Sequence, residues 1–250
     1  MKALITGASS GIGKDIAIYL SSLGYDLIVV ARRKEKLDEL KKICKTNVEV
    51  ISIDLSDVNN CMELYERTKD YNIDVLINNS GFGLCGNFFD TELNKELEMI
   101  DLNIKGLHIL TKLFLKDMQI RNNGYILNVS SSAAFAPGPL MATYYSTKSY
   151  VFKLSQSIYR ELKQSKSNVH ISVLCPGPVE TEFNDVANVK FAFKPQSSKF
   201  VAKYAIDMMF KNKLTIVPGF NMKLAKIFSK LLPDKLLSII IFHSQKRKLK

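Results

Sequence analysis

Residues 6–13 read Thr6-Gly7-Ala8-Ser9-Ser10-Gly11-Ile12-Gly13, and they join an apolar run at residues 2–6 to a helical pattern. Glycines between a strand and a helix are typical of a nucleotide-binding turn, in which the helix N-terminus faces phosphates. Gly7 would allow a tight turn, Gly11 would let backbone approach a pyrophosphate, and Gly13 would let the helix pack close to the sheet. The GxxxGxG spacing differs from the general GxGxxG fingerprint, so this stretch alone leaves an ordinary strand–turn–helix open.

Short apolar runs alternate with helical patterns along the rest of the chain. We expect strands at residues 2–6, 27–31, 48–53, 73–78, 125–130, 169–174 and 214–217, and helices at 11–23, 34–45, 57–69, 93–119, 143–164 and 197–211. Several of the strands are almost continuously apolar, as in parallel sheets that are covered on both faces. This alternation predicts an α/β fold with a Rossmann-type, doubly wound parallel sheet and right-handed crossovers.

Composition favours one domain with a large core. Hydrophobic residues make up 46% of the 250 residues, and no Pro-, Gly- or Ser-rich linker divides the chain. We expect a catalytic and nucleotide-binding part at residues 1–220, with residues 221–250 as a basic, amphipathic extension of the same domain. The cysteines form no CxxC pair and the histidines are isolated, which predicts reduced thiols and no metal site.

The net charge of +11 is unevenly distributed along the chain. Residues 1–210 hold 25 basic and 23 acidic residues, whereas residues 211–250 hold 10 basic residues and one acidic residue. A high pI fits a nucleic-acid partner, but the nearly neutral body and the lack of a nucleic-acid motif predict none. Met1-Lys2 leads directly into the first apolar run, and no apolar run approaches the ~20 residues that span a bilayer. We therefore expect a cytoplasmic protein, soluble or peripheral to a membrane.

The end of the second strand indicates which dinucleotide would bind. NAD sites usually place an acidic residue there for the ribose hydroxyls, whereas arginine suits the 2′-phosphate of NADP. Here the strand is followed by Arg32 and Arg33, with no acid. A solvated, basic helix start is the alternative, since Lys34 and Lys36 follow. Cations at a helix N-terminus oppose the helix dipole, which favours a functional role for the arginines and predicts NADP.

Tyr144 and Lys148 lie four residues apart on a predicted helix, so their side chains share a face. The pKa of a free tyrosine is ~10. A neighbouring ammonium and an oxidised nicotinamide would lower it, so Tyr144 could donate or accept a proton. Tyr145 is the competing candidate, but only Tyr144 has a lysine four residues later. As an isolated pair, this spacing is a weak signal.

Four further motifs occur along the chain and make the Tyr144–Lys148 pair more specific. They are Asn78-Asn79-Ser80-Gly81, Asn103-Ile104-Lys105-Gly106, Ser130-Ser131-Ser132 and Pro176-Gly177-Pro178-Val179-Glu180-Thr181. Over residues 1–218 the set resembles the compact, single-domain branch of the short-chain dehydrogenase/reductase family. One departure is Ser80, where the family's motif usually has alanine; we expect it to be harmless.

The resemblance implies a sheet of about seven strands and a catalytic tetrad of Asn103, Ser131, Tyr144 and Lys148. Tyr144 would protonate a carbonyl oxygen as NADPH delivers hydride to the carbon, and Ser131 would stabilise that oxygen. Lys148 would hold the nicotinamide ribose and tune Tyr144, while Asn103 would hold a water in a proton relay. Ser131 lies 13 residues before Tyr144, as the family's spacing requires, although Ser130 and Ser132 stay open.

The resemblance also implies a cofactor site. Asp54 and Leu55 would contact adenine, Asn79-Ser80-Gly81 the adenosine ribose, and Val179 and Thr181 the carboxamide. The complete predicted set is Gly7, Ser9, Ser10, Gly11, Ile12, Gly13, Arg32, Arg33, Asp54, Leu55, Asn79, Ser80, Gly81, Tyr144, Lys148, Pro176, Gly177, Val179 and Thr181. Helices 93–119 and 143–164 would pair with a second subunit to form a homodimer or homotetramer.

Apolar segments near this site indicate a lipophilic ketone, aldehyde or secondary alcohol as substrate. They contain Phe82, Leu84, Phe88, Phe89, Ala133, Ala134, Phe135, Leu140, Met141, Phe183, Phe191 and Phe193. Ordinary core packing is the alternative for any one of them. Residues 182–200 would form a flap over the substrate. A narrower hypothesis is reduction of 3-oxoacyl thioesters, and a different one is a non-catalytic NADP-binding sensor.

The C-terminal segment follows no family pattern. Leu224, Ile227, Phe228, Leu231 and Leu232 form one helical stripe, and Lys223, Lys226 and Lys230 lie largely off it. Pro233 should break this helix before a second apolar stretch at residues 236–242. An amphipathic, cationic helix can lie on an anionic membrane, which makes a membrane-associated interaction protein a further hypothesis. The alternative is a lid over the substrate or a subunit contact.

Overall fold

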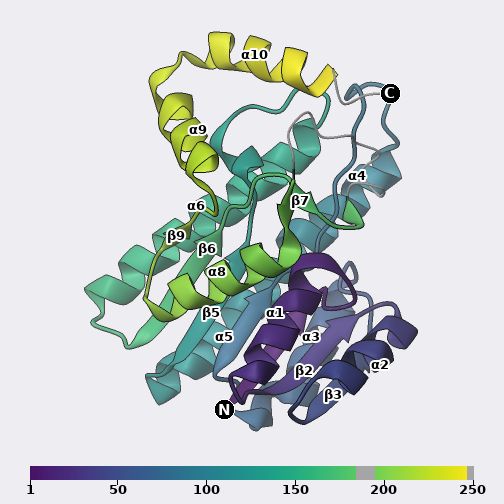
Figure 1. Ribbon diagram of the computed structural model, residues 1–250, viewed down its shortest axis with the longest axis vertical. Coiled ribbons are helices and arrows are strands. Elements are labelled where there is room, and N and C mark those ends of the chain that lie inside the picture. Colours follow the sequence, from purple (N-terminus) through teal and green to yellow (C-terminus); the bar gives the residue numbers. More distant parts are fainter. Residues whose placement is uncertain (184–194, 247–250) are drawn as a thin grey trace.

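A parallel sheet of seven strands, in the order β3-β2-β1-β4-β5-β6-β9, forms the centre of the fold in the computed structural model (Figure 1). The structure describes residues 1–183 and 195–246. The strands are β1 (Lys2–Thr6), β2 (Asp26–Ala31), β3 (Val48–Ser52), β4 (Val75–Asn78), β5 (Gly124–Val129), β6 (Val169–Leu174) and β9 (Thr215–Ile216). The order reverses between β1 and β4, where ligands bind in folds of this type. The predicted Rossmann-type fold is therefore confirmed.

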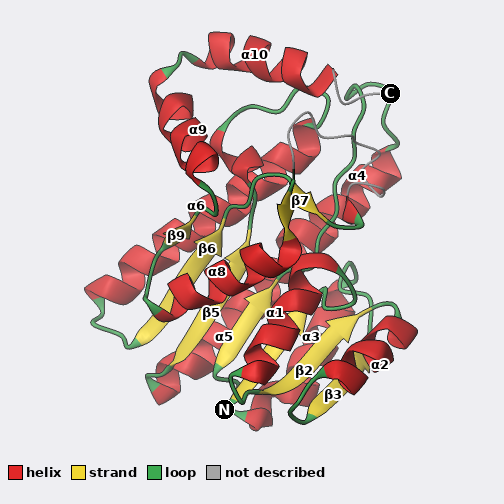
Figure 2. Ribbon diagram, viewed as in Figure 1, coloured by secondary structure: helices red, strands yellow, loops and turns green. Residues whose placement is uncertain are grey.

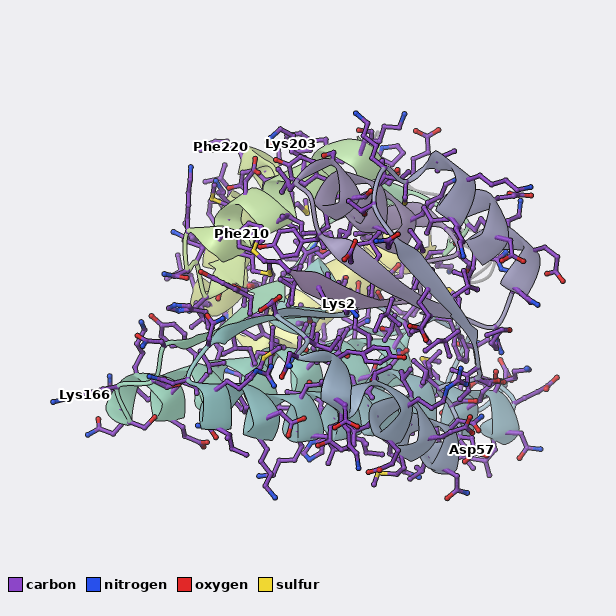
Figure 3. All side chains as sticks on the ribbon, turned by 90° about the horizontal axis from the view of Figure 1, so that it is seen from below. Lys2, Asp57, Lys166, Lys203, Phe210 and Phe220 are labelled. Carbon is purple, nitrogen blue, oxygen red and sulfur yellow. The ribbon has the colours of Figure 1, made fainter. Side chains whose placement is uncertain are left out.

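Helices cover both faces of the sheet (Figure 2). They are α1 (Gly11–Ser22), α2 (Lys34–Ile43), α3 (Val58–Thr68), α4 (Leu93–Ile100), α5 (Leu107–Arg121), α6 (Ala142–Gln164), α8 (Ser198–Phe210), α9 (Phe220–Leu231) and α10 (Asp234–Lys246). Short 3₁₀ turns lie at η1 (Lys69–Tyr71) and η3 (Ser132–Phe135). Charged side chains extend outward, as Lys166 does in the turn after α6 (Figure 3).

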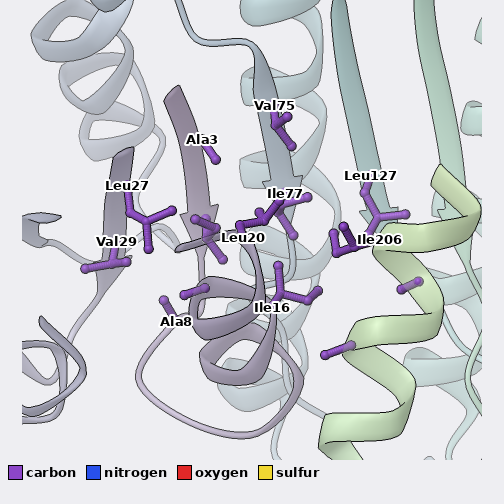
Figure 4. Close-up of a cluster of buried hydrophobic side chains, with 14 of the residues drawn as sticks. Ala3, Ala8, Ile16, Leu20, Leu27, Val29, Val75, Ile77, Leu127 and Ile206 are labelled. Atoms are coloured by element: carbon purple, nitrogen blue, oxygen red, sulfur yellow. The ribbon is translucent and has the colours of Figure 1, made fainter. Parts of the chain in front are cut away.

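Alternate residues of each strand point to opposite faces, so the sheet divides the core in two. On one face, Ala3 and Ile5 of β1 pack with Ile16 of α1 and with α8 (Figure 4). On the other face, Leu4 packs with α3 and α5, which contribute Leu64 and Phe114 among others. Because residues of both parities are buried, β1 and β2 are apolar almost throughout, which explains why the sequence predicted these strands well.

The prediction of one continuous α-helix at residues 93–119 was wrong in one respect, because the helix is interrupted. A π-helical segment, η2 (Asp101–Gly106), separates α4 from α5 and contains Asn103. A π turn adds a residue to the helical repeat and is frequent at functional sites. Gly106 approaches the backbone here, since a Cβ on it would lie 2.7 Å from the carbonyl oxygen of Leu55. The pairing of this region with a second subunit stays a prediction.

A second, two-stranded parallel sheet was not predicted. It joins β7 (Val179–Glu180) to β8 (Gln196–Ser197), on either side of residues 184–194. Most of the predicted flap, including Phe191 and Phe193, lies outside the described residues. The part that is described shows the two ends of that segment tied together beside the sheet's carboxyl edge.

The C-terminal residues form two helices that extend beyond the main body, drawn in yellow in Figure 1. Pro233 lies between α9 and α10, as the sequence predicted. The arch that they form contacts η3, which lies between β5 and α6. Within the residues that the structure describes, no helix has the length and apolarity needed to cross a bilayer.

A buried chain of polar side chains fixes α5 and α6 to the sheet. The Asn78 Nδ2 donates to Thr111 Oγ1 and to Asn128 Oδ1, both at 2.9 Å. The Asn128 Nδ2 in turn donates to Ser155 Oγ of α6 at 3.1 Å. Buried amides without such partners are costly, so these contacts specify where α6 lies along the strands.

Replacing Asn128 with alanine should lower the free energy of unfolding by about 1–3 kcal/mol, because Asn78 and Ser155 would lose buried partners. Asn123→Ala is the matched control, since Asn123 is exposed just before the same strand. Urea denaturation followed by circular dichroism measures both. Equal stability of the two variants would contradict the structural role of this chain.

Candidate active site

A cleft of about 1320 Å³ lies at the carboxyl edge of the sheet and extends from the glycine-rich turn to α9 and α10. Most of the predicted site residues line it: Gly7, Ser9, Ser10, Gly11, Ile12, Arg32, Arg33, Asp54, Leu55, Asn79, Ser80, Gly81, Ser131, Tyr144, Lys148, Pro176, Gly177, Val179 and Thr181. Gly13 and Asn103 lie behind the lining and shape it through their neighbours. The topology therefore brings segments far apart in sequence to one place.

The glycine-rich turn has no room for side chains. Gly7 and Gly11 have positive φ angles of 64° and 54°, which favour glycine. A Cβ on Gly13 would lie 2.4 Å from both the Gly7 carbonyl oxygen and the Asn79 Nδ2. Gly13 thus permits α1 to start directly against the turn. Its role is close packing, as predicted, although its neighbours are the turn and Asn79.

Thr6 ties the glycine-rich turn to the end of the neighbouring strand β4, a role that was not predicted from the sequence. Its hydroxyl accepts from the backbone N–H of Asn79 at 2.9 Å and of Ser80 at 3.1 Å. The Asn79 side chain donates to the carbonyls of Thr6 and Gly7, both at 3.1 Å. The Asn79 amide therefore braces the turn. A hydroxyl at the last strand position, just before Gly7, was the available signal.

The two arginines lie at the edge of the cleft but differ in their partners. The Arg33 guanidinium donates to Ser9 and Ser10 at 3.0 and 3.2 Å, and to Glu182 at 2.7 Å. Arg32 lies 3.4 Å from Glu98 and 3.6 Å from Asp54. Arg33 therefore sits over the N-terminus of α1, where an anion would be favoured.

Asp54 lies at the far end of the cleft from Tyr144, in the loop after β3. Its Oδ1 accepts from the backbone N–H and the hydroxyl of Ser56, at 3.0 and 2.9 Å. Partial burial opposes its ionisation, but the Ser56 hydrogen bonds and the charge of Arg32 hold its pKa below the ordinary value. Asp54 is therefore a charged acceptor at the predicted adenine position.

Tyr144, Ser131 and Lys148 line the same part of the cleft. Against the larger effect of burial, Ser131 is close enough to lower the pKa of the Tyr144 hydroxyl, and the Lys148 Nζ lies 5.8 Å from the centre of the Tyr144 ring. The Lys148 Nζ also donates to the Val129 carbonyl at 3.1 Å. Burial raises the pKa of Tyr144 well above its ordinary value, while burial lowers the pKa of Lys148 to about 8. Tyr144 is thus a neutral hydroxyl that can donate a proton.

The geometry separates the alternatives that the sequence left open. The Ser130 hydroxyl is buried and donates to the Lys148 carbonyl at 2.7 Å, so it supports α6 rather than facing Tyr144. The Tyr145 hydroxyl accepts from Gln245 of α10. Of the candidates, Ser131 and Tyr144 are the pair that meets beside Lys148.

Asn103 joins three segments behind the site. Its Oδ1 accepts from the Phe82 N–H at 3.1 Å, and its Nδ2 donates to the Phe82 carbonyl at 2.9 Å and to Thr147 at 3.1 Å. A Cβ on Gly81 would lie 2.7 Å from the Asn103 Oδ1 and 3.3 Å from the Lys148 Nζ. The side chain therefore positions the loop after β4 against α6. Any water that Asn103 held would bond to its remaining acceptors, because both amide hydrogens are used.

The apolar lining agrees with the prediction only in part. Phe82, Leu84, Ala133, Phe135, Met141 and Phe183 line the cleft. Phe88 and Phe89 were predicted wrongly, since their exposed fractions are 67% and 84%. A turn, in which the N–H groups of Asp90 and Thr91 bond to the Asn87 carbonyl, directs them into solvent. Ala134 packs on the core cluster around Phe152, and Leu140 is buried beside the cleft.

Comparison with known proteins gives this cleft a context. The model of the short chain dehydrogenase family matches residues 1–190. An uncharacterized oxidoreductase of Staphylococcus epidermidis is 32% identical over 186 residues, which are 73% of this chain and 80% of that protein.

Solved structures agree over almost the whole chain. A short-chain dehydrogenase from Sphingobium yanoikuyae in complex with NADPH is 27% identical, with a TM-score of 0.83 over 92% of this chain and 93% of that one. A short-chain dehydrogenase/reductase from Burkholderia phymatum in complex with NAD has a TM-score of 0.82 at 21% identity, over 90% of this chain and 91% of that one. The second likeness concerns the fold alone.

Proposed function

Because this chain belongs to the short-chain dehydrogenase/reductase family and is an oxidoreductase, we propose that it transfers hydride between NADPH and a lipophilic ketone, aldehyde or secondary alcohol. One observation supports this most directly. The glycine-rich turn and the residues Ser131, Tyr144 and Lys148 line one and the same cleft. A dinucleotide lying along it would bring its reactive ring to the proton donor.

The residues present fit a dinucleotide. The first turn of α1 lines the cleft, and its N-cap, Ser10, has no side-chain cap on the helix N–H groups. Gly11 lets the backbone come close, since a Cβ there would lie 2.8 Å from the Thr181 methyl group. Arg33 and Asp54 flank the adenosine end that this placement defines. When bound, the nicotinamide would supply or accept the hydride.

The chain's own residues would handle the proton. Tyr144 keeps its proton in this buried position and can donate it to a carbonyl oxygen. Ser131, which lines the cleft beside Tyr144, would donate its hydroxyl hydrogen to the same oxygen as negative charge develops. The Lys148 ammonium would favour the tyrosinate that remains. In the oxidative direction, the same tyrosinate would accept the alcohol proton.

The walls of the cleft favour an apolar substrate. Beside Tyr144 they include Phe82, Met141 and Phe183, and across from these lie Phe228, Leu232 and Ile240 of the C-terminal arch. A 3-oxoacyl thioester is the narrower candidate, for which the basic C-terminal segment could dock an acidic carrier. Tyr144, Ser131 and Lys148 lie together, which supports catalysis over a purely sensory NADP-binding role.

The unmodified protein should bind NADPH more tightly than NADH, because Arg33, Ser9 and Ser10 can all donate to a 2′-phosphate. Arg33→Ala should cost about 1.5–3 kcal/mol of NADPH binding, or roughly ten- to a hundredfold, with little effect on NADH. Titrations of reduced-nicotinamide fluorescence measure both dissociation constants. Arg67→Ala, on an exposed turn of α3, is the control. Equal constants in the unmodified protein would contradict the cofactor assignment.

Tyr144→Phe should reduce turnover by at least a hundredfold while leaving NADPH binding nearly unchanged, since the ring remains and only the proton is lost. Tyr145→Phe is the matched neighbour, and it should retain most turnover because its hydroxyl bonds to Gln245 instead. NADPH oxidation with a panel of lipophilic ketones measures both. Near-normal turnover of Tyr144→Phe, together with loss of turnover in Tyr145→Phe, would contradict the assignment and identify Tyr145 as the proton donor.

A further inference from the structure

The helix α9 carries an apolar stripe that the rest of the described chain leaves uncovered. Phe220, Leu224, Ile227 and Leu231 recur every three or four residues and therefore share one face. Their exposed fractions are 72%, 37%, 55% and 73%. Exposed apolar surface that is contiguous in this way usually marks an interaction site.

The substrate cleft cannot be what covers this stripe. A different side of α9, formed by Met222, Ala225, Phe228 and Ser229, lines the cleft together with Leu232, which follows the helix. The single stripe expected from the sequence is therefore divided, because Phe228 and Leu232 face the cleft and Leu224, Ile227 and Leu231 do not. On α10 the cleft-lining residues likewise include Leu237, Ser244 and Gln245, whereas Leu236 and Ile239 are 45% and 49% exposed elsewhere on the helix. The arch thus has an inner apolar side that faces the cleft and an outer one that faces solvent.

A row of lysines lies beside the outer stripe. Lys223, Lys226 and Lys230 lie on the third side of α9, where Lys223 rests above the Tyr204 ring at 5.8 Å and Lys226 above the rings of Phe135 and Phe152 at 5.5 and 5.6 Å. Among the described residues, no ion pair involves a basic residue of α9 or α10. The one acidic residue from 211 to 250 is Asp234. These positive charges are therefore not neutralised within the arch by ion pairs.

We propose that the outer face of the α9–α10 arch docks onto the surface of an anionic lipid bilayer. An apolar stripe beside a row of lysines matches the acyl boundary and the acidic headgroups of such a surface. A second copy of this chain fits less well, because a twofold contact would bring two strongly basic segments together. Docking in this way would also hold the arch, and the cleft that its inner side lines, close to a source of lipophilic substrate, a consequence that rests on the proposed function.

Vesicle sedimentation tests the docking without reference to catalysis. At low salt the full-length protein should sediment with vesicles of equal parts phosphatidylcholine and phosphatidylglycerol, and high salt should release it. Vesicles of phosphatidylcholine alone should bind it at least tenfold more weakly. Ile227→Ser with Leu231→Ser should reduce binding to the anionic vesicles about tenfold or more. Ile120→Ser, at an equally exposed position on α5, should have no effect.

The alternatives give different results. Failure to bind the anionic vesicles, or equal binding to both kinds, would overturn the proposal. So would a self-association, seen by light scattering, that the paired α9 substitutions abolish while vesicle binding is unchanged. Circular dichroism checks that the paired variant keeps its fold.

A separate observation concerns Glu182, which follows the motif that ends at Thr181. Its carboxylate lies 2.7 Å from the Arg33 guanidinium, whose Nη2 also donates to the Ser10 hydroxyl at 3.2 Å. The Arg33 bond is the main reason that the pKa of Glu182 is held below its ordinary value. A carboxylate therefore already lies on Arg33, one of the donors that a 2′-phosphate would use.

From this contact we infer that Glu182 competes with the 2′-phosphate and so limits the preference for NADPH, an inference that rests on the proposed function. A 2′-phosphate bound at Arg33 would lie beside the negative Glu182 carboxylate and compete with it for the guanidinium, whereas NADH brings no phosphate to that position. The pair is exposed, with both side chains 48% accessible, so its effect on affinity is modest.

Glu182→Gln should tighten NADPH binding about two- to fivefold and leave NADH binding unchanged. Glu180→Gln, two residues earlier and exposed, is the control and should change neither. In an Arg33→Ala background, Glu182→Gln should have no effect, because the competition is gone. Unchanged or weaker NADPH binding in Glu182→Gln would overturn this inference. Equal NADPH and NADH binding by the unmodified protein would instead contradict the proposed function.

Discussion

The rest of this structure depends on the close contact of Gly13 with the glycine-rich turn, which leaves no space for a Cβ at position 13. Gly13 lies against the Gly7 carbonyl and the Asn79 amide, so α1 begins directly over the turn that ends β1. Asn79 and the Thr6 hydroxyl tie this turn to the end of β4. The crossing of two strand ends and one helix start thereby defines the floor of the cleft, and it aims the helix N-terminus along it.

Buried hydrogen bonds also hold α6, the helix that carries Tyr144 and Lys148, in place. Asn103, in the π-helical segment, grips both backbone groups of Phe82 and reaches Thr147 on α6. The Asn78–Asn128–Ser155 chain fixes the same helix to the sheet lower down. Tyr144 and Lys148 thus sit on an element that is held at two levels, with their own side chains buried and unable to relax into water. This burial keeps Tyr144 protonated and lowers the pKa of Lys148.

The fold could be predicted from sequence because its signals are local. Strands buried on both faces read as apolar runs, and a tyrosine four residues before a lysine shares its helical face wherever that helix packs. What could not be predicted depends on contacts between distant residues. The π-helical segment lies where the helix meets the loop after β3, at Gly106 and Leu55, and Phe88 and Phe89 point outward because of a turn around Asn87. The Arg33–Glu182 pair joins residues 149 positions apart, and no spacing rule foretells it.

The arch of α9 and α10 contacts the body through Met222 on Gly177 and Gln245 on Tyr145, among other places. It lines the substrate end of the cleft, while the glycine-rich turn and Arg33 lie at the other end. Selection can therefore rebuild the arch without disturbing the floor beneath the dinucleotide. Residues 220–246 thus form a separable wall of the cleft, and exchanging this segment for its counterpart from another member of the family is a direct way to alter the wall while keeping the glycine-rich turn.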